Sequence, residues 1–291
     1  MTDCTQIFCV IDDFFKAFEP IYWQYLKQEK LKVRVRPSML TLSEIVFIAV
    51  YYKISQFNHF KAFYQSLDQL DIKPFRTLPS YERMIYLINQ HQLALHALHY
   101  ALTKPQQGEP LWLDSTILPV CKNHRIQRHR SLKQIATRGK SSMGWFFGCK
   151  LHILMNQDGD IVRSCLSNGH VADIKKVEEL VDGLTARVYA DRGYISQQLK
   201  DLLARQGIDL VTYQRKNMQA IKLPYTDEYH LRQRNKIETL FSLLKGTYQL
   251  VTSLHRCVAG YLAGIYAALI AYQIAQQNKP KIHVLQAMAY P

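Results

Sequence analysis

The order of apolar segments after residue 110 constrains the fold of this chain more than any other feature of the sequence. Five short apolar runs are typical of strands, and two helical segments separate the last three of them. The strand runs lie at 111–120, 145–155, 161–166, 186–190 and 208–213, and the helical segments at 172–181 and 196–206. A turn sequence at 156–159 joins the second and third runs into a hairpin. A hairpin followed by two strand–helix–strand units predicts a mixed five-stranded sheet with helices on its faces.

This element order is that of the RNase H-like fold, and a region of a different kind precedes it. Residues 1–103 carry apolar residues at helical spacing, and Thr41 with Glu44 forms the capping-box pattern of a helix start. We expect an all-helical N-terminal domain at 1–103, a polar linker from residue 103 to 110, and an RNase H-like domain with C-terminal helices at 104–291. The first domain is either a helix-turn-helix reader of DNA or a plain helical bundle.

An uncharged segment near the C-terminus, residues 258–275, just reaches the length of a membrane-spanning helix. It is rich in Ala, Gly and Tyr, and it contains Gln273. We interpret it as a buried helix packed against a sheet, and we expect no membrane partner.

The charge balance points to a polyanionic partner, either nucleic acid or an anionic membrane surface. The chain has 37 Lys and Arg against 23 Asp and Glu, a formal net charge of +14. No acidic residue occurs between Asp114 and Asp158, a stretch that holds eight basic residues and Trp145. This acid-free stretch favours a surface that follows DNA phosphates, although a run of charge is also typical of an ordinary solvated face. We expect Trp145 in the core, with stacking on a flipped base as the alternative.

The six cysteines form no CxxC pair, and the first residues do not resemble a secretory signal. We therefore expect reduced thiols in a cytoplasmic protein. Cys121, His124 and His129 lack a fourth ligand at a recognised spacing, which argues against a zinc site.

Three carboxylates stand where chemistry is expected. Asp114 interrupts an apolar strand, where an unpaired charge is too costly to bury. Asp191 follows a strand end, the place where α/β sheets hold ligands. Glu238 lies beside the apolar stripe of a helix, on a polar strip with Arg234 and Lys245. Each has an ordinary alternative: a turn or capping residue for the two aspartates, and a surface glutamate paired with Arg234 for Glu238.

Taken together, the three acids suit phosphoryl transfer. Magnesium prefers a few carboxylates, with water and phosphate oxygens completing its shell, and two such ions activate the attacking oxygen and stabilise the leaving one. We expect Asp114, Asp191 and Glu238 to bind two Mg²⁺ ions, for which Mn²⁺ substitutes in assays.

Four segments make the chain resemble the DDE transposases of bacterial insertion sequences, most closely the insertion-sequence family numbered nine-eighty-two. They are LWLDST around Asp114, GWFFGCKLH from Gly144, YADRGY around Asp191, and RNKIETLFSLLK from Arg234. The resemblance implies an RNase H-like catalytic domain with Asp114, Asp191 and Glu238 as catalytic metal ligands. It also implies cleavage and strand transfer on transposon terminal repeats and target DNA, and a homodimer when DNA is bound.

Many such enzymes carry the third acid in a Tyr-x2-Arg-x3-Glu-x6-Lys pattern. Arg234, Glu238 and Lys245 match that spacing, but Leu231 stands in the tyrosine position and Tyr229 is only a nearby substitute. The expected DNA contacts are Arg234, Lys245, Lys150, His152, Arg192, Lys140 and Arg138.

Two other functions stay open at this stage. An RNase H-like nuclease would share the carboxylates but cleave without joining strands. An inactive DNA-binding protein of transposon origin would bind ends without chemistry, although the presence of all three acids argues against such decay.

Overall fold

The computed structural model describes residues 4–30, 39–67, 77–104, 110–142, 144–214, 222–251 and 255–276. They form two compact units, each of which is described by itself. The helical unit takes its residues from 4–102, 244–250 and 255–276, and the sheet unit from 103–243 and 251. Most of the expected linker, 105–109, lies outside the described residues, and the expected domain boundary there stays a prediction.

The helical unit contains the helices predicted for the N-terminal region, together with one from the C-terminus. They are α1 (Cys4–Gln28), α2 (Leu42–Ile54), α3 (Phe60–Ser66), α4 (Tyr81–Gln90), α5 (Gln92–Ala101) and α10 (Val258–Gln276). The predicted capping box is present: the backbone N–H of Glu44 donates to Thr41 Oγ1 over 3.2 Å, and that of Thr41 donates to Glu44 Oε2 over 2.6 Å. These two bonds satisfy N–H groups that the first turn of α2 would otherwise leave unpaired.

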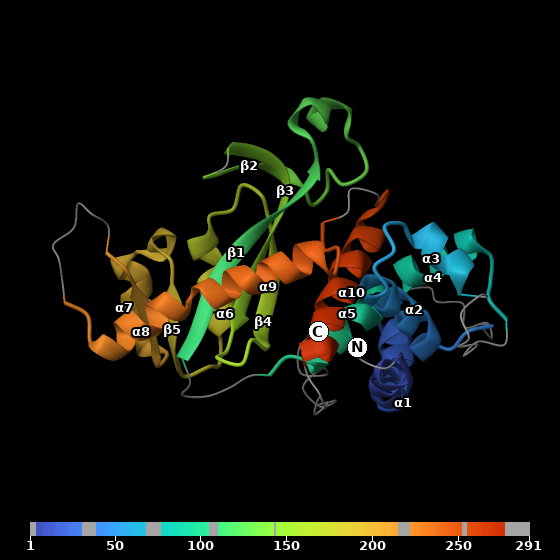
Figure 1. Ribbon diagram of the computed structural model, residues 1–291, viewed down its shortest axis with the longest axis horizontal. Coiled ribbons are helices and arrows are strands. Elements are labelled where there is room, and N and C mark those ends of the chain that lie inside the picture. The colour runs from blue at the N-terminus through green and yellow to red at the C-terminus, as the bar shows by residue number, and fades with distance from the viewer. Residues whose placement is uncertain are drawn as a thin grey trace. The chain divides into compact units, whose positions relative to one another are not determined.

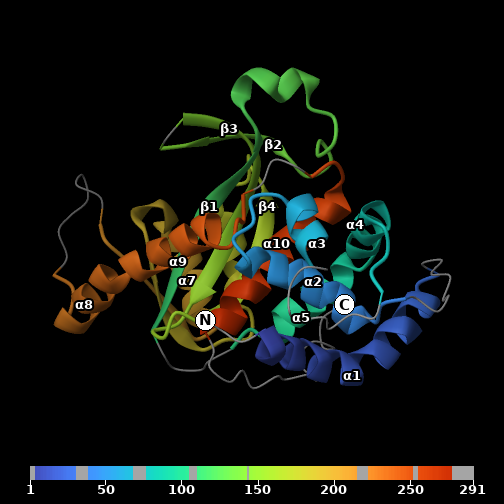
Figure 2. The same ribbon diagram turned by 45° about the vertical axis from the view of Figure 1, so that its right-hand side comes forward.

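Helix α10 packs on other helices, which corrects the expectation that it would pack against a sheet. It contacts α2, α4 and α5, and Figures 1 and 2 show it beside α2 and α5 in both views. Buried Gln273 fixes the contact with α5, since its Oε1 lies 2.8 Å from His99 Nδ1. Among the described residues, α10 alone has the length and mean hydropathy (1.5) of a membrane span, and 67% of that stretch is buried.

The sheet unit has the RNase H-like arrangement predicted from the element order, with six strands and not five. The strands are β1 (Pro110–Cys121), β2 (Thr137–Ser141), β3 (Gly144–Met155), β4 (Ile161–Asn168), β5 (Ala186–Ala190) and β6 (Ile208–Thr212). Strand β3 pairs antiparallel with β1, β2 and β4, whereas β1, β5 and β6 are parallel neighbours (Figure 1). The sixth strand, β2, extends the edge beside the first half of β3.

Alternation along β1 divides its residues between the two faces of the sheet. One face carries Leu111 and Leu113, which pack with Val188 and Ala190 of β5. Two helices cover this face: α6 (Val177–Val181), reached through the 3-10 turn η2 (Asp173–Lys176), and α7 (Gln197–Arg205). The opposite face carries Trp112 and Asp114.

Two hydrogen-bonded contacts fix α8 (Tyr225–Gln233) to the Trp112 face of the sheet. The indole Nε1 of Trp112 donates to the carbonyl oxygen of His230 over 2.7 Å. The carboxylate of Asp227, only 4% exposed, accepts from Tyr189 Oη at 2.9 Å and from Arg187 Nη1 at 3.1 Å. A buried carboxylate needs such partners, because an unpaired buried charge would lower the stability of the fold by about 3–5 kcal/mol. The next helix, α9 (Asn235–Gly246), continues directly from this anchored helix.

Backbone contact between β1 and β3 makes Gly148 the position of a specific prediction. A Cβ at Gly148 would lie 2.1 Å from the carbonyl oxygen of Leu118, a backbone atom that has nowhere to move within the paired strands. We expect Gly148→Ala to lower the free energy of unfolding by about 3 kcal/mol, as severe overpacking does. Urea unfolding measures it. Gly246→Ala is the control, because a Cβ added there would meet no atom within 4 Å beyond its own helix and its chain neighbours, and an equal loss in both variants would contradict the prediction.

Candidate active site

Two of the predicted acids come together at the carboxyl end of a parallel strand pair. Strand β5 ends at Ala190, which pairs with Leu113, whereas β1 continues to Cys121 paired only with β3. The next residues on the two strands are Asp191 and Asp114. Asp191 is exposed, and it begins the 3-10 turn η3 (Arg192–Tyr194). The two carboxylates therefore lie at the edge where parallel sheets hold their ligands, as the sequence predicted.

Helix α9 brings the third acid to the same face of the sheet. Its apolar stripe, with Ile237, Leu240 and Phe241, is buried, and this orients Glu238 toward the side where Arg234 lies. Arg234 Nη1 lies 3.0 Å from Asp114 Oδ2, and Arg234 Nη2 lies 3.1 Å from Glu238 Oε1. One guanidinium thus joins the strand acid to the helix acid, across 120 residues of sequence. The predicted pairing with Glu238 is present, and the contact with Asp114 is an addition to it.

Burial sets the protonation of Asp114. Its side chain is 20% exposed, and desolvation raises the pKa of the carboxyl to about 6. The backbone N–H of Ser115, which donates to Oδ1 over 2.8 Å, and the charge of Arg234 lower the pKa and offset part of this rise. The negative charges of Asp191 and Glu238 raise it further. All three acids are therefore close enough to interact, and an additional cation among them would relieve their repulsion.

The three acids are the candidates for holding a divalent cation. In the part of the chain that the structure describes, no three His, Cys, Asp or Glu side chains are close enough to hold a metal ion together. The Arg234 guanidinium lies between Asp114 and Glu238 and supplies positive charge there. Carboxylate oxygens are the ligands that magnesium and manganese prefer. Asp114, Asp191 and Glu238 are of this chemical type, and the Arg234 guanidinium would have to leave its place between two of them for an ion to bind there.

The structure places Lys150 and His152 inside the sheet unit, and not on a DNA-facing surface as expected. Asp114 pairs with Ile153, so His152 and Lys150 point to the opposite face of the sheet. His152 is fully buried, and burial lowers its pKa to about 4. Lys150 Nζ pairs with Asp173 Oδ1 over 2.9 Å. The Lys150 contact holds the turn η2, which begins at Asp173, against the sheet, and His152 Nε2 lies 2.7 Å from Ser167 Oγ of β4.

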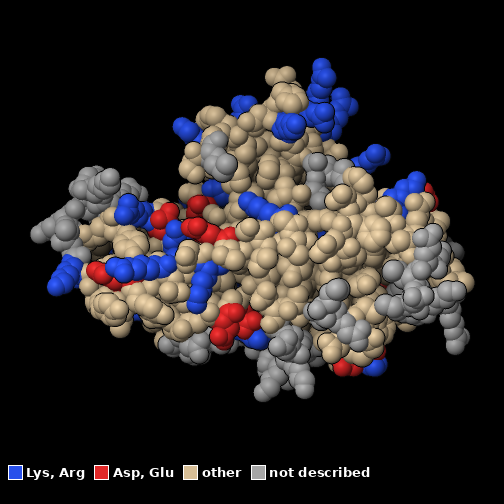
Figure 3. Space-filling view, in the orientation of Figure 1, with Lys and Arg blue, Asp and Glu red and all other residues tan. Residues whose placement is uncertain are grey.

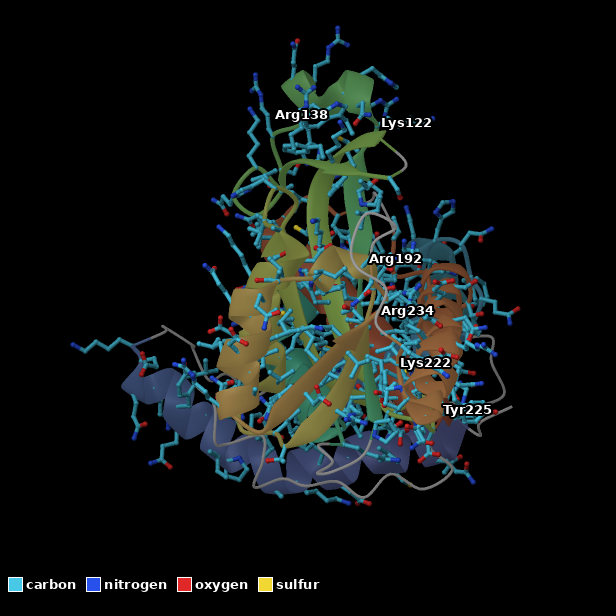
Figure 4. All side chains as sticks on the ribbon, turned by 90° about the vertical axis from the view of Figure 1, so that its left-hand side faces the viewer. Lys122, Arg138, Arg192, Lys222, Tyr225 and Arg234 are labelled. Carbon is cyan, nitrogen blue, oxygen red and sulfur yellow. The ribbon has the colours of Figure 1, made fainter. Side chains whose placement is uncertain are left out.

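Two other predicted DNA contacts, Arg192 and Lys245, are exposed. Arg192 follows Asp191, and its guanidinium carbon lies 5.9 Å from the ring centre of Tyr213. Lys245 is exposed near the end of α9, in the turn that belongs to the helical unit. Leu231, in the tyrosine position of the motif, is buried in the core, whereas Tyr229 is 52% exposed on α8. Figure 4 shows Arg192 and Arg234 on the same side of the sheet unit.

Arg138 and Lys140 lie on β2 with both side chains exposed. Trp145 of β3 corrects an expectation, because it is 57% exposed and not a core residue. The segment between the end of β1 and the start of β3 carries many basic side chains and no acidic ones. Figure 3 shows these basic side chains on the face that it draws. Figure 4 places Lys122 and Arg138 at this end of the unit. We call residues 122–142 and 144–145 the basic tip.

Two further residues were not among the predicted site residues. Tyr194 is 2% exposed, and burial together with Asp114, Asp173 and Asp191 raises the pKa of its hydroxyl. Asp227 fixes α8, as described above. Tyr194 ends the YADRGY segment, but nothing in that segment singled it out beside Asp191, and an acid early in a helix, like Asp227, is ordinary in sequence.

An RNase H-like sheet with acids at its carboxyl edge is the arrangement expected of a phosphoryl-transfer enzyme. The fold is similar to that of the piggyBac transposase in a synaptic complex with hairpin DNA. The TM-score is 0.53 at 13% sequence identity, over 94% of this chain and 75% of that one. The family described as Transposase DDE domain matches residues 106–258, more than half of the chain, and the chain belongs to it.

The protein is therefore a DNA transposase of the DDE type, a polynucleotidyl transferase with a divalent-metal requirement. No curated protein has a matching sequence.

Proposed function

We propose that this transposase cleaves and rejoins DNA at the ends of a bacterial insertion sequence of the family numbered nine-eighty-two, with Asp114, Asp191 and Glu238 as its catalytic metal ligands. The observation that carries the proposal is the pair of contacts from Arg234 to Asp114 and Glu238. A helix residue and a strand residue far apart in sequence share one cation, at the place where Asp191 also raises the pKa of Asp114.

The proposal gives each side chain of the site a role in binding metal or DNA. Asp114, Asp191 and Glu238 would hold two Mg²⁺ ions, which when bound activate the attacking oxygen and stabilise the leaving oxygen. Arg234, released from Asp114, would hold a DNA phosphate beside the reacting one with its planar fork of N–H donors. Arg192 and Lys245 are further proposed phosphate contacts, and contacts of this kind position the DNA without reading its sequence.

The partners follow from the same proposal. They are the terminal repeats of the element and a target DNA, and the piggyBac structure named above holds hairpin DNA. Bringing two ends together would require a homodimer on DNA. The proposed location is the bacterial cytoplasm, at the nucleoid when DNA is bound.

Strand joining tests the proposal. Purified protein is incubated with labelled DNA carrying the terminal repeats, a target plasmid and magnesium. Nicked ends together with joined product support the proposed function. Cleavage without joining would establish the nuclease alternative instead. Tight end binding with neither reaction, in magnesium or manganese, would identify an inactive relative.

The position of Arg234 leads to a prediction about metal affinity. Because the guanidinium occupies the place between Asp114 and Glu238, we expect Arg234→Gln to bind Mn²⁺ roughly 10-fold more tightly, since a charge-assisted hydrogen bond no longer competes. The same variant should bind terminal DNA more weakly. Electron paramagnetic resonance of free Mn²⁺ measures the first effect, and gel-shift titration the second.

Arg232→Gln is the matched control for this prediction. Arg232 is 73% exposed and pairs with Glu228 four residues away at 3.7 Å, a similar contact that touches none of the three acids. Unchanged Mn²⁺ affinity in Arg234→Gln would show that Arg234 does not compete for the ion position.

A further inference from the structure

We propose that the basic tip carries a second nucleic-acid site, in which the ring of Trp145 stacks on an unpaired DNA base while Arg138 and Lys140 hold the adjoining phosphates. This rests on the proposed function, since it assigns a substrate feature to the same enzyme. The site lies outside the group of Asp114, Asp191 and Glu238.

The surroundings of Trp145 are unusual for a tryptophan. Its side chain is 57% exposed, although burying an indole is favourable and the other tryptophan of this unit, Trp112, is 1% exposed. Strand β2 pairs Lys140 directly with Trp145 and Arg138 with Phe147, so both cations stand on the tryptophan side of the ribbon. Arg138 Cζ lies 6.0 Å and Lys140 Nζ 5.8 Å from the centre of the indole ring.

The backbone under this group is held firmly. Asn123 Nδ2 donates to the carbonyl oxygen of Trp145 over 2.8 Å, which ties the start of the basic tip to β3. Gly139, between the two cations, packs so closely that a Cβ there would lie 2.2 Å from the carbonyl oxygen of Gly169. The aromatic face and its two cations are therefore presented from paired strands and not from a loose loop.

Charge identifies the occupant as nucleic acid. The sequence from 115 to 157 contains no acidic residue. Within the described part of the chain, none of the basic side chains from Lys122 to Lys140 forms an ion pair. An exposed aromatic ring among cations without partners matches the way proteins bind unstacked bases, with stacking on the ring and phosphates on the charges.

Strand geometry places this site relative to the acids. Ile153 pairs with Asp114, and Trp145 lies eight residues before Ile153 on the same face of β3. At a rise of about 3.3 Å per residue this separation is at most about 26 Å along the strand. A strand of duplex DNA advances about 3.4 Å per nucleotide, so the unpaired base would lie within roughly eight nucleotides of the reacting phosphate.

Binding, measured apart from chemistry, tests the inference. All proteins carry Glu238→Gln, and the probes are duplexes of about 30 base pairs, fully paired or with one unpaired 2-aminopurine. The two probes are compared by titration, and fluorescence quenching of the 2-aminopurine reports stacking. We expect the parent to prefer the unpaired probe roughly 5- to 150-fold, the usual range for one stacked base. Trp145→Ala should lose the preference and the quenching, and Trp145→Phe should keep most of both.

The double variant Arg138→Gln, Lys140→Gln provides the second arm. It should weaken binding of both probes alike and reduce the slope of log affinity against log salt by about 2, for two lost phosphate contacts. The inference is overturned if the parent shows no preference, or if Trp145→Ala keeps it. It is also overturned if Trp145→Ala changes only self-association in sedimentation, which would make the ring a protein contact. Failure of strand joining in the earlier assay leaves this binding result unaffected, so the two proposals fail separately.

Discussion

Glu238→Gln is expected to lower both cleavage and strand joining by at least about 1000-fold, while folding and DNA-end binding remain. Glutamine keeps the size of the side chain and its place on α9, where Glu238 is 60% exposed, so the stability of the helix should hardly change. It removes the negative charge that a hard divalent cation requires, and phosphoryl transfer in such sites depends on that charge. Single-turnover rates on labelled terminal DNA, with binding measured in parallel, give the two quantities.

The chain provides a close control for this variant. Glu228 on α8 is also an exposed helix glutamate paired with an arginine four residues away, at 3.7 Å from Arg232. Glu228→Gln should leave the rates within about twofold, as surface changes away from a site do. If Glu238→Gln retains wild-type rates, the third metal ligand is another residue and the assignment of Glu238 fails.

Asp114→Asn is expected to make the metal-free protein more stable at pH 7.5 while it abolishes catalysis. Burial and two neighbouring carboxylates raise the pKa of Asp114 from 3.8 to about 6. A raised carboxyl pKa means that the folded state holds this proton more tightly than the unfolded state. The stabilisation is therefore complete below pH 3.8 and is lost as the pH rises through 6. At about 1.36 kcal/mol per pKa unit, the loss is on the order of 3 kcal/mol.

Urea unfolding in EDTA at pH 4.5 and pH 7.5 measures this difference. The stability gained by Asp114→Asn relative to wild type should grow between the two pH values. Magnesium at pH 7.5 should then stabilise the wild type and not the variant, by mass action on the folded state. Asp201→Asn is the control, because this exposed acid of α7 accepts a hydrogen bond from Gln197 on the same helix and lies outside the group of three acids. An equal gain in stability at both pH values would show that the folded protein does not raise the pKa of Asp114.

Most of the sheet could be predicted from sequence because its strands have strong local signals. The turn at 156–159 contains Gly159 at φ 87°, and Asn156 Oδ1 accepts the backbone N–H of Asp160 over 2.8 Å, so the hairpin is specified locally. Strand β2 was missed because its sequence, TRGKS, is polar and has no apolar alternation. Its pairing depends on Gly139 and Gly148 approaching backbone atoms of other segments, which a linear pattern does not reveal.

The same distinction applies to the site. Strand order was enough to place Asp114 and Asp191 together, since both stand where parallel neighbours end. The sequence could not tell which face of the sheet Lys150 and His152 occupy. A shift of one residue in the pairing of β1 with β3 moves every side chain of the strand to the opposite face. The exposure of Trp145 was missed for a similar reason: an apolar run predicts a strand but not where its covering helices stop. Helix α10 is apolar all round, and such a helix fits any apolar surface.

The way β1 runs past the end of β5 has a consequence for how this enzyme could diversify. The strand contributes Asp114 where its parallel neighbour stops, and only beyond that point does it continue into the basic tip. Residues there could be exchanged, lengthened or shortened while the pairing that positions the acids stays the same. Relatives could thus acquire new DNA preferences by replacing one peripheral segment, and an engineer could graft a tip from one transposase onto the conserved chemistry of another.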